Sequence, residues 1–340
     1  MRRIATLTLV AVLTVALATN AKALDTVKTA DDTISGTIKS VSALKVVVER
    51  GSTAREIAAG DVESISYDGE PSVLKTARIA AAAGRYEDAL ESLAELNLAE
   101  IERREIAQDI QYYRAYSAAR MALVGNGDIG EAGSKVFAFV SANKDSYHYL
   151  EAQMLFGDLA EAAGKHAAAQ SAYKAVGQAA PWPEYRARAG VALGRSYLAE
   201  GKIAEASGAF KIALNTPDTA PGVQAQKLAA TLGEARCLAA NKKIDEATAM
   251  IEQVIKQADS EDHELLAEAY NALGSSYRAS NRPKDALLAF LHVDLVYFNS
   301  PQNHIEALQN LTELWKEQQM PERSAEAARV LRDRYKRAPR

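Results

Sequence analysis

The sequence predicts a mainly α-helical fold, an α-solenoid of about seven helix pairs preceded by a small antiparallel β module. Three observations lead to this prediction. Alternation of apolar and polar residues with period two is confined to positions 33–67. From Ser72 onward, Ala-rich helical periodicity takes its place. Within the helical part, small and aromatic residues recur at a fixed spacing, which indicates a repeat array.

The composition is that of an ordinary globular chain. The 340 residues are 48% hydrophobic and 25% charged, which argues against long disorder, collagen or a membrane bundle. The single cysteine, Cys237, excludes an intramolecular disulfide and a Cys-rich metal site. The formal net charge of −4 disfavours general nucleic-acid binding, so no nucleic-acid partner is expected.

Residues 1–23 have the three parts of a cleavable signal peptide. Arg2 and Arg3 precede an apolar run over 4–18, and Ala21 and Ala23 supply small residues two apart. The run is shorter than the ~20 residues of a comfortable membrane span, so we expect no integral span after cleavage. The alternative is an uncleaved N-terminal anchor helix. No cysteine for a lipid anchor lies nearby, so a bacterial periplasmic or secreted protein is expected.

Residues 24–70 are expected to form the β module. Ile34, Gly36 and Ile38 alternate with polar residues, and 45–49 is a β-branched run. Further strands are expected at 56–58 and 62–67, separated by turn signals. Four or five short strands suggest a small bent sheet or barrel, whose order of features resembles the Sm-like and SH3-like barrels. Such a unit buries little surface alone, so it should pack on the first helices.

Residues 71–340 carry the repeat signature. An alanine follows a glycine by 12 positions, and an aromatic residue follows the same glycine by 16. The three copies are Gly157/Ala169/Tyr173, Gly194/Ala206/Phe210 and Gly274/Ala286/Phe290. This signature resembles tetratricopeptide repeats (TPRs), whose helix pairs stack into a superhelix with a ligand groove. Close approach of two helices at the glycine and alanine, with the aromatic ring against the next helix, would explain the spacing.

No sequence motif points to catalysis. Gly125, Gly127 and Gly130 spell G-x-G-x-x-G, but a helix is expected before them, so an inter-helix turn is the better interpretation. The five histidines fall in different repeats without ligand spacing. Cys237 lies among Ala and Leu and is expected to be a buried small hydrophobe. We therefore expect no catalytic residue, metal or cofactor, and a periplasmic hydrolase is disfavoured.

The resemblance implies a concave groove lined by the first helix of each pair. Counted from the packing glycines, an arginine row and one asparagine face it: Arg188, Arg195, Arg236, Asn271 and Arg278. Glu151, Met154, Asp158, Val191, Ser275, Gln309 and Glu313 occupy further groove positions. The row would clamp a peptide carboxylate or an acidic segment. The alternative is a set of solvated charges paired with Glu on the helix faces.

Two functional hypotheses follow. The first is a non-enzymatic exported scaffold that mediates protein–protein interaction through the groove. The second is a structural subunit of a cell-envelope or extracellular assembly, self-associating through β-module and repeat-end contacts. The partner is accordingly another protein, a peptide segment or a second copy of the chain. Trp182, between Pro181 and Pro183, is either an exposed anchor for that partner or a plug between repeats.

Overall fold

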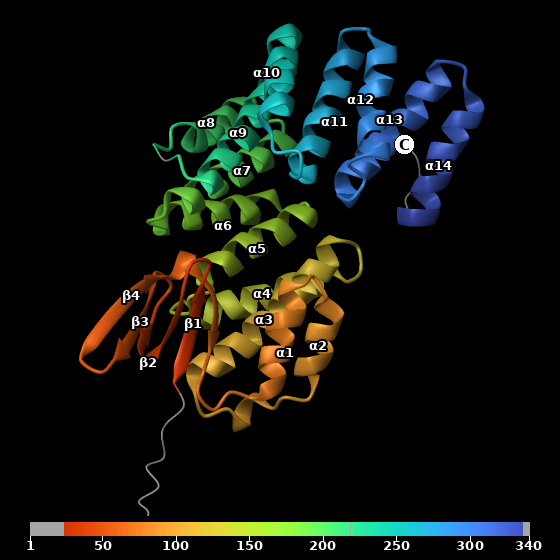
Figure 1. Cartoon of the computed structure of the whole chain (residues 1–340). Helices are drawn as coiled ribbons and strands as arrows, with labels where there is room; N and C mark the ends of the chain where they lie inside the picture. Colours follow the sequence, from red (N-terminus) through yellow and green to blue (C-terminus); the bar gives the residue numbers. More distant parts are fainter. Residues whose placement is uncertain (1–23, 218, 336–340) are drawn as a thin grey trace, which may run out of the picture.

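The computed structural model describes residues 24–217 and 219–335. Over these ranges a five-stranded sheet is followed by fourteen α-helices, which confirms the mainly α fold with its small antiparallel β module (Figure 1). The expected signal peptide lies outside the described ranges. Within them, no helix is both long and apolar enough to cross a bilayer.

The β module is an antiparallel sheet with strand order β4-β3-β2-β1-β5. Its strands are β1 Asp25–Thr29, β2 Thr33–Val41, β3 Lys45–Arg50, β4 Thr53–Ala58 and β5 Val62–Ser66. Gly36 permits a close strand crossing, because a Cβ there would lie 2.5 Å from the carbonyl oxygen of Glu49. The sequence pattern does not identify β1, which nevertheless lies inside the sheet and pairs with both β2 and β5.

The helices form seven consecutive pairs. They are α1 Ser72–Ala82, α2 Tyr86–Ala94, α3 Arg104–Leu123, α4 Ile129–Ala142, α5 Tyr149–Ala162, α6 His166–Ala179, α7 Pro183–Ala199, α8 Ile203–Leu214, α9 Pro221–Ala240, α10 Ile244–Gln257, α11 His263–Ala279, α12 Pro283–Leu295, α13 Pro301–Glu317 and α14 Pro321–Tyr335. Short turns join the two helices of a pair. One of them holds Gly125 at φ 89° between α3 and α4, where the glycine-rich motif lies.

Each repeat signature places an aromatic ring on a glycine. A Cβ at Gly194 would lie 2.5 Å from the ring of Phe210, and one at Gly274 would lie 2.7 Å from Phe290. The glycine of the first helix therefore makes room for the ring of its own pair. Phe210 also lies against Gly233 of the next pair, so one ring packs two successive repeats together.

The β module shares one hydrophobic core with the first helix pairs. Val27 and Ile65 of the sheet are fully buried in the same cluster as Leu74 of α1 and Ile110 of α3. Figure 1 shows the sheet beside these helices, while the C-terminal pairs extend away from it. The core that the strands cannot bury alone is thus completed by the repeats.

Candidate interaction groove

The first helices of successive pairs line one side of the superhelix. Contacts join α1 to α3 and α3 to α5, and likewise α7 to α9, α9 to α11 and α11 to α13. Neighbouring first helices that touch one another form the inner, more closely packed side of a stack of helix pairs. This inner side carries the arginine row, and we call it the groove.

Arg188 of α7 is paired with a carboxylate of the preceding repeat. Its Nη1 and Nη2 donate to Glu151 Oε2 and Oε1 at 2.7 and 3.0 Å, a bidentate pair between α7 and α5. Burial opposes the charge of Arg188, but Glu151 outweighs it and raises the pKa of the guanidinium. Both side chains are partly exposed, so the pair lies at the edge of solvent.

Arg195 and Arg236 share one acceptor on a third helix. Arg195 Nη2 donates to Glu268 Oε2 at 2.5 Å, and Arg236 Nη1 lies 3.6 Å from Glu268 Oε1. These residues belong to α7, α9 and α11, so one carboxylate connects three successive first helices and borders a hollow of about 310 Å³. Burial raises the pKa of Glu268, but the two arginines outweigh it and hold that pKa below its usual value.

Arg278 continues the same pattern one repeat later. Its Nη1 and Nη2 donate to Glu313 and Glu317 of α13 at 2.8 and 2.6 Å. Asn271 is fully buried instead: its Nδ2 donates to the carbonyl of Asn303 at 2.9 Å, and its Oδ1 has no partner in the described part of the chain. The structure therefore places four arginines at the groove and the asparagine beneath its surface.

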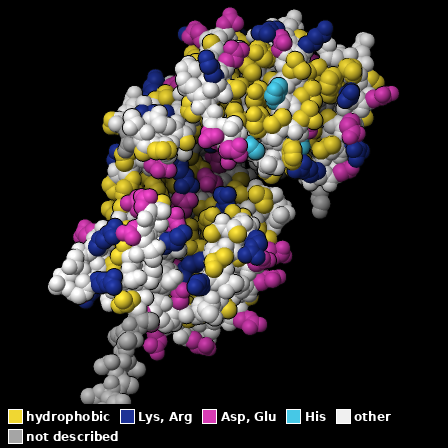
Figure 2. Space-filling view, viewed as in Figure 1, with side chains coloured by type: hydrophobic (Ala, Val, Ile, Leu, Met, Phe, Trp, Pro, Cys, Tyr) yellow, Lys and Arg dark blue, Asp and Glu magenta, His cyan; other side chains and the backbone are white. Residues whose placement is uncertain are grey.

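Two of the flanking groove positions are wrong. Met154 and Val191 are buried in hydrophobic clusters, because their helix faces turn toward the neighbouring helices. Ser275 and Gln309 do line a polar hollow of about 530 Å³ between α11 and α13. Figure 2 shows acidic and basic side chains mixed in the hollow region midway along the molecule, as the paired arginines require.

The remaining candidate groups are the cysteine and the histidines, and the structure gives those described here packing and hydrogen-bonding roles within the fold. Cys237 is buried, and burial raises the pKa of its thiol to about 11, which leaves it protonated at neutral pH. Over the described ranges, no three His, Cys, Asp or Glu side chains gather as metal ligands. His148 and His304 are buried and hydrogen-bonded to Asp109 and Asp294, respectively.

Sequence reasoning places Glu151 and Glu313 at the groove with the arginines that they pair with, but it does not identify Glu268. Arg195 and Glu268 are 73 residues apart, and only the curvature of the superhelix brings them together. No spacing in the sequence carries that information. A second group that the sequence pattern does not identify is a set of tyrosines between the sheet and α3, although Tyr112, Tyr113 and Tyr116 visibly cluster along the chain.

One of the solved structures compared with the chain shows the same fold. No family model and no curated protein matches the chain. A tetratricopeptide repeat protein from Parabacteroides merdae is similar over 76% of this chain and 90% of its own, with 15% identity and a TM-score of 0.57. The apo form of RapI matches 77% of this chain and 75% of its own (13% identity, TM-score 0.47). The C-terminal part of a TPR protein from Cytophaga hutchinsonii matches 76% and 94% (13% identity, TM-score 0.43). The chain has a TPR-like α-solenoid fold.

Proposed function

We propose that the chain is a non-enzymatic, exported scaffold that binds another protein or a peptide segment in its groove. The observation that carries the proposal is the row of four arginines on the inner side of a TPR-like solenoid. Each arginine is held in place by a carboxylate from another helix of the same chain. Such side chains are ordered before a ligand arrives, which lowers the entropic cost of binding.

In this proposal, recognition works by exchange: a carboxylate of the ligand replaces an internal glutamate as the partner of an arginine. A ligand carboxylate that replaces an internal glutamate exchanges one charge-assisted pair for another, so the cost is small as long as the released glutamate keeps a second cation. Arg195 suits this exchange, because its side chain is 45% exposed while that of Glu268 is 14% exposed. A ligand carboxylate can approach the open side of Arg195 while Glu268 keeps its contact with Arg236.

The first prediction tests the groove. Replacing Arg195 and Arg236 by Ala would leave Glu268 without a cation, so the variant also carries Glu268→Gln. Loss of two charge-assisted hydrogen bonds, each contributing about 1.5–3 kcal/mol, should lower partner affinity at least a hundredfold. The measurement is surface plasmon resonance with the partner recovered from an envelope extract, at low and high salt, since salt weakens exposed ion pairs.

Two control variants separate binding from folding. Glu268→Gln alone keeps both arginines and should retain the partner. Arg329→Ala removes an exposed arginine of α14 that pairs with Glu326 of the same helix, and it should change nothing. A triple variant that holds its partner at full strength, or a partner that contacts only the β module, would contradict the groove as the binding site.

Export is the second prediction. The tripartite segment over 1–23 motivates it, and β1 begins at Asp25, two residues after the expected cleavage point. The mature protein from its native host should begin near Leu24. Mass spectrometry of that protein is the measurement, and an intact N-terminal peptide containing Arg2 or Arg3 would refute cleavage.

A structural subunit remains the second candidate function, and one observation favours it. The helix α12 and the turn after it expose Leu288, Leu295 and Val296, with Leu295 68% exposed. Exposed apolar side chains close together are typical of surfaces that become covered in an assembly. Sedimentation of the purified protein distinguishes the candidates, because self-association without a partner favours the subunit and a monomer favours the scaffold.

A further inference from the structure

The hollow of about 310 Å³ beside Arg195 and Arg236 has apolar walls. Leu198 and Ala199 line it from α7, and Ala229 lines it from α9. Ala199 is exposed, and Leu198 and Ala229 are half-buried, so apolar surface is open to a ligand at this point. The groove therefore holds an apolar hollow directly next to two of its arginines.

Buried side chains close the floor of the hollow. Phe210 and Leu232 line it, and Phe210 is fully buried. The Phe210 ring packs on Gly194 and Gly233 and offers no open face to a ligand. An aromatic side chain would gain no ring stacking here, whereas an aliphatic side chain needs only apolar walls. The volume is at the lower end of the range of about 300–1,000 Å³ for ligand pockets, which suits a single aliphatic side chain.

The charges at the rim of the hollow favour an anion beside that side chain. Glu268 is the one carboxylate that pairs with Arg195 and Arg236 in the described ranges, so two cations share one anion. Glu264 and Asp158 also favour the charged form of Arg195, but neither forms an ion pair with it in those ranges. The side chains of the two arginines remain 45% and 31% exposed. A ligand carboxylate would therefore meet accessible guanidinium groups.

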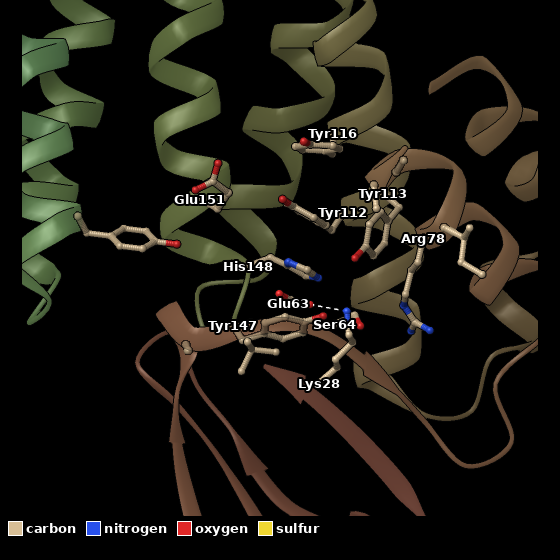
Figure 3. Close-up of a pocket in the computed structure, with 16 residues that line it drawn as sticks. Lys28, Glu63, Ser64, Arg78, Tyr112, Tyr113, Tyr116, Tyr147, His148 and Glu151 are labelled. Carbon is tan, nitrogen blue, oxygen red and sulfur yellow. Dashed lines mark hydrogen bonds and ion pairs between the residues drawn. The ribbon is translucent and has the colours of Figure 1, made fainter. Parts of the chain in front are cut away.

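The cavity between the β module and α3 is less suited to such a ligand. It holds about 450 Å³, and Figure 3 shows Lys28 and Glu63 on its sheet side and Glu151 on its helix side. Lys28 pairs with Glu63 at 2.6 Å, and the buried Arg78 is held by two carboxylates. Among the described residues that line this cavity, each Lys and Arg thus has at least one carboxylate of its own. The hollow beside Arg195 is the better site for an anion.

We propose that this hollow binds one bulky aliphatic side chain of a partner segment, from the residue next to the carboxylate that reaches Arg195. The inference rests on the proposed function, and it adds the sequence feature that the groove selects in its partner. Directed hydrogen bonds from the arginine orient the segment, and burial of the side chain contributes affinity. A chain terminus and an Asp or Glu side chain offer the same carboxylate chemistry.

The test uses the whole protein and short synthetic peptides. One probe, acetyl-Gly-Ser-Gly-Ser-Leu, ends in a free carboxylate. The other, acetyl-Gly-Ser-Gly-Glu-Leu, has an amidated end and carries its carboxylate on the Glu side chain. Each probe has a counterpart with Gly in place of Leu, and NMR titration measures all four affinities. At least one Leu probe should bind, at least tenfold more tightly than its Gly counterpart, and that probe identifies the source of the carboxylate.

Two variants at matched positions test the hollow itself. Ala199 ends α7 and Ala279 ends α11, and both are exposed. Ala199→Leu fills the hollow from its open edge and should weaken binding of the Leu probe at least tenfold. Ala279→Leu adds the same group at a position that does not line the hollow and should bind as the wild type does. Both melting temperatures should stay close to that of the wild type, because neither alanine is buried.

Several outcomes would overturn the proposal. They are equal binding of the Leu and Gly peptides, no binding of either Leu probe, and full binding of the Leu probe by Ala199→Leu. Self-association of the purified protein that Ala199→Leu abolishes would assign the hollow to a second copy of the chain, and would overturn the proposal as well.

Failure of the hollow is distinguishable from failure of the groove. If the Arg195/Arg236/Glu268 variant loses its partner while Ala199→Leu holds that partner at full strength, the hollow proposal is wrong and the scaffold function stands. If the Leu probe binds through the hollow while the arginine variant keeps its partner, the hollow proposal stands and the groove is not the partner site. Under both proposals together, the arginine variant and Ala199→Leu should each weaken the partner and the Leu probe.

Discussion

Asp25 shows how one buried carboxylate can fix the position of a strand. Its oxygens accept bidentate hydrogen bonds from Arg103 at 2.6 and 2.9 Å, and the backbone N–H groups of Ile38 and Asp68 donate to it at 2.9 Å. Arg103 precedes α3, and its guanidinium also lies over the ring of Tyr67. One side chain thus joins β1, β2, the end of the sheet and the third helix.

The third prediction concerns acid stability. Burial raises the pKa of Asp25, but Arg103 and the two N–H donors outweigh it, so the folded pKa is lower than the unfolded value of about 3.9. The stabilisation is present above about pH 4 and is lost as the pH falls toward the folded pKa. Asp25→Asn should lower the unfolding free energy at pH 7 by about 1.5–3 kcal/mol.

Urea unfolding between pH 7 and pH 3 measures this effect. The difference between wild type and Asp25→Asn should shrink below pH 4, because the wild type then loses the charge that the variant lacks throughout. Asp32→Asn is the control, since its carboxylate is exposed and its partners are the exposed Arg55 and the neighbouring backbone N–H of Thr33, so its charge should contribute little. A difference independent of pH would mean that Asp25 acts through packing and not through its charge.

At the scale of the element, small residues decide how closely the two helices of a pair approach. Ala206 is fully buried where α8 packs on α7, and Ala286 is fully buried where α12 packs on α11. Each alanine lies three positions after the first residue of its helix. The aromatic ring one turn later rests on the glycine of the partner helix. The alanine and the ring therefore fix the same contact from two sides.

The fourth prediction follows from this burial. Ala206→Glu or Ala286→Glu would place a charge in the contact without a partner, which should cost several kcal/mol of unfolding free energy. Glu205→Ala, one residue away and exposed, should change stability by no more than about 0.5 kcal/mol. Thermal unfolding followed by circular dichroism is the measurement. Equal melting temperatures for the three variants would show that the repeat register is wrong.

The repeat could be found from sequence where the contact has fixed geometry. Gly194 and Gly274 lie 12 residues before their alanines because α7 and α11 each continue five residues past the glycine. Gly233 does not follow this spacing, because α9 continues seven residues past it. In addition, Ile251 occupies the position at which an aromatic residue is expected. The Arg195–Glu268 ion pair could not be predicted from the sequence for another reason. The two residues are brought together only by the curvature of the stacked helix pairs.

At the scale of the whole molecule, Trp182 joins the β module to the fourth helix pair. Its indole packs against Gly60, where a Cβ would lie 3.0 Å from Cδ2, and it contacts hydrophobic clusters on both sides. The ring is a plug between repeats and not an exposed anchor, and its contact with Gly60 adds the β module to that packing. The sheet is therefore attached at α1 and α3 by its core and at α7 by this ring.

The fifth prediction tests that attachment. Trp182→Ala removes the ring that packs on Gly60 of the 3-10 turn Ala59–Asp61 from the start of α7, and should cost about 3 kcal/mol. Because repeat stacks transmit contacts mainly to neighbours, hydrogen exchange should rise in residues 59–65 and in α7. Exchange in α11–α14 should stay unchanged, since those helices share no cluster with Trp182.

Trp315→Ala is the matched control at the other end of the chain. Trp315 is partly buried against the cluster formed by α11–α14, so its removal should raise exchange there and leave the β module protected. Opposite exchange patterns for the two tryptophan variants would establish that the sheet is held by the solenoid at two separated points. Unchanged exchange at 59–65 in Trp182→Ala would mean that the shared core with α1 and α3 is enough to hold the sheet.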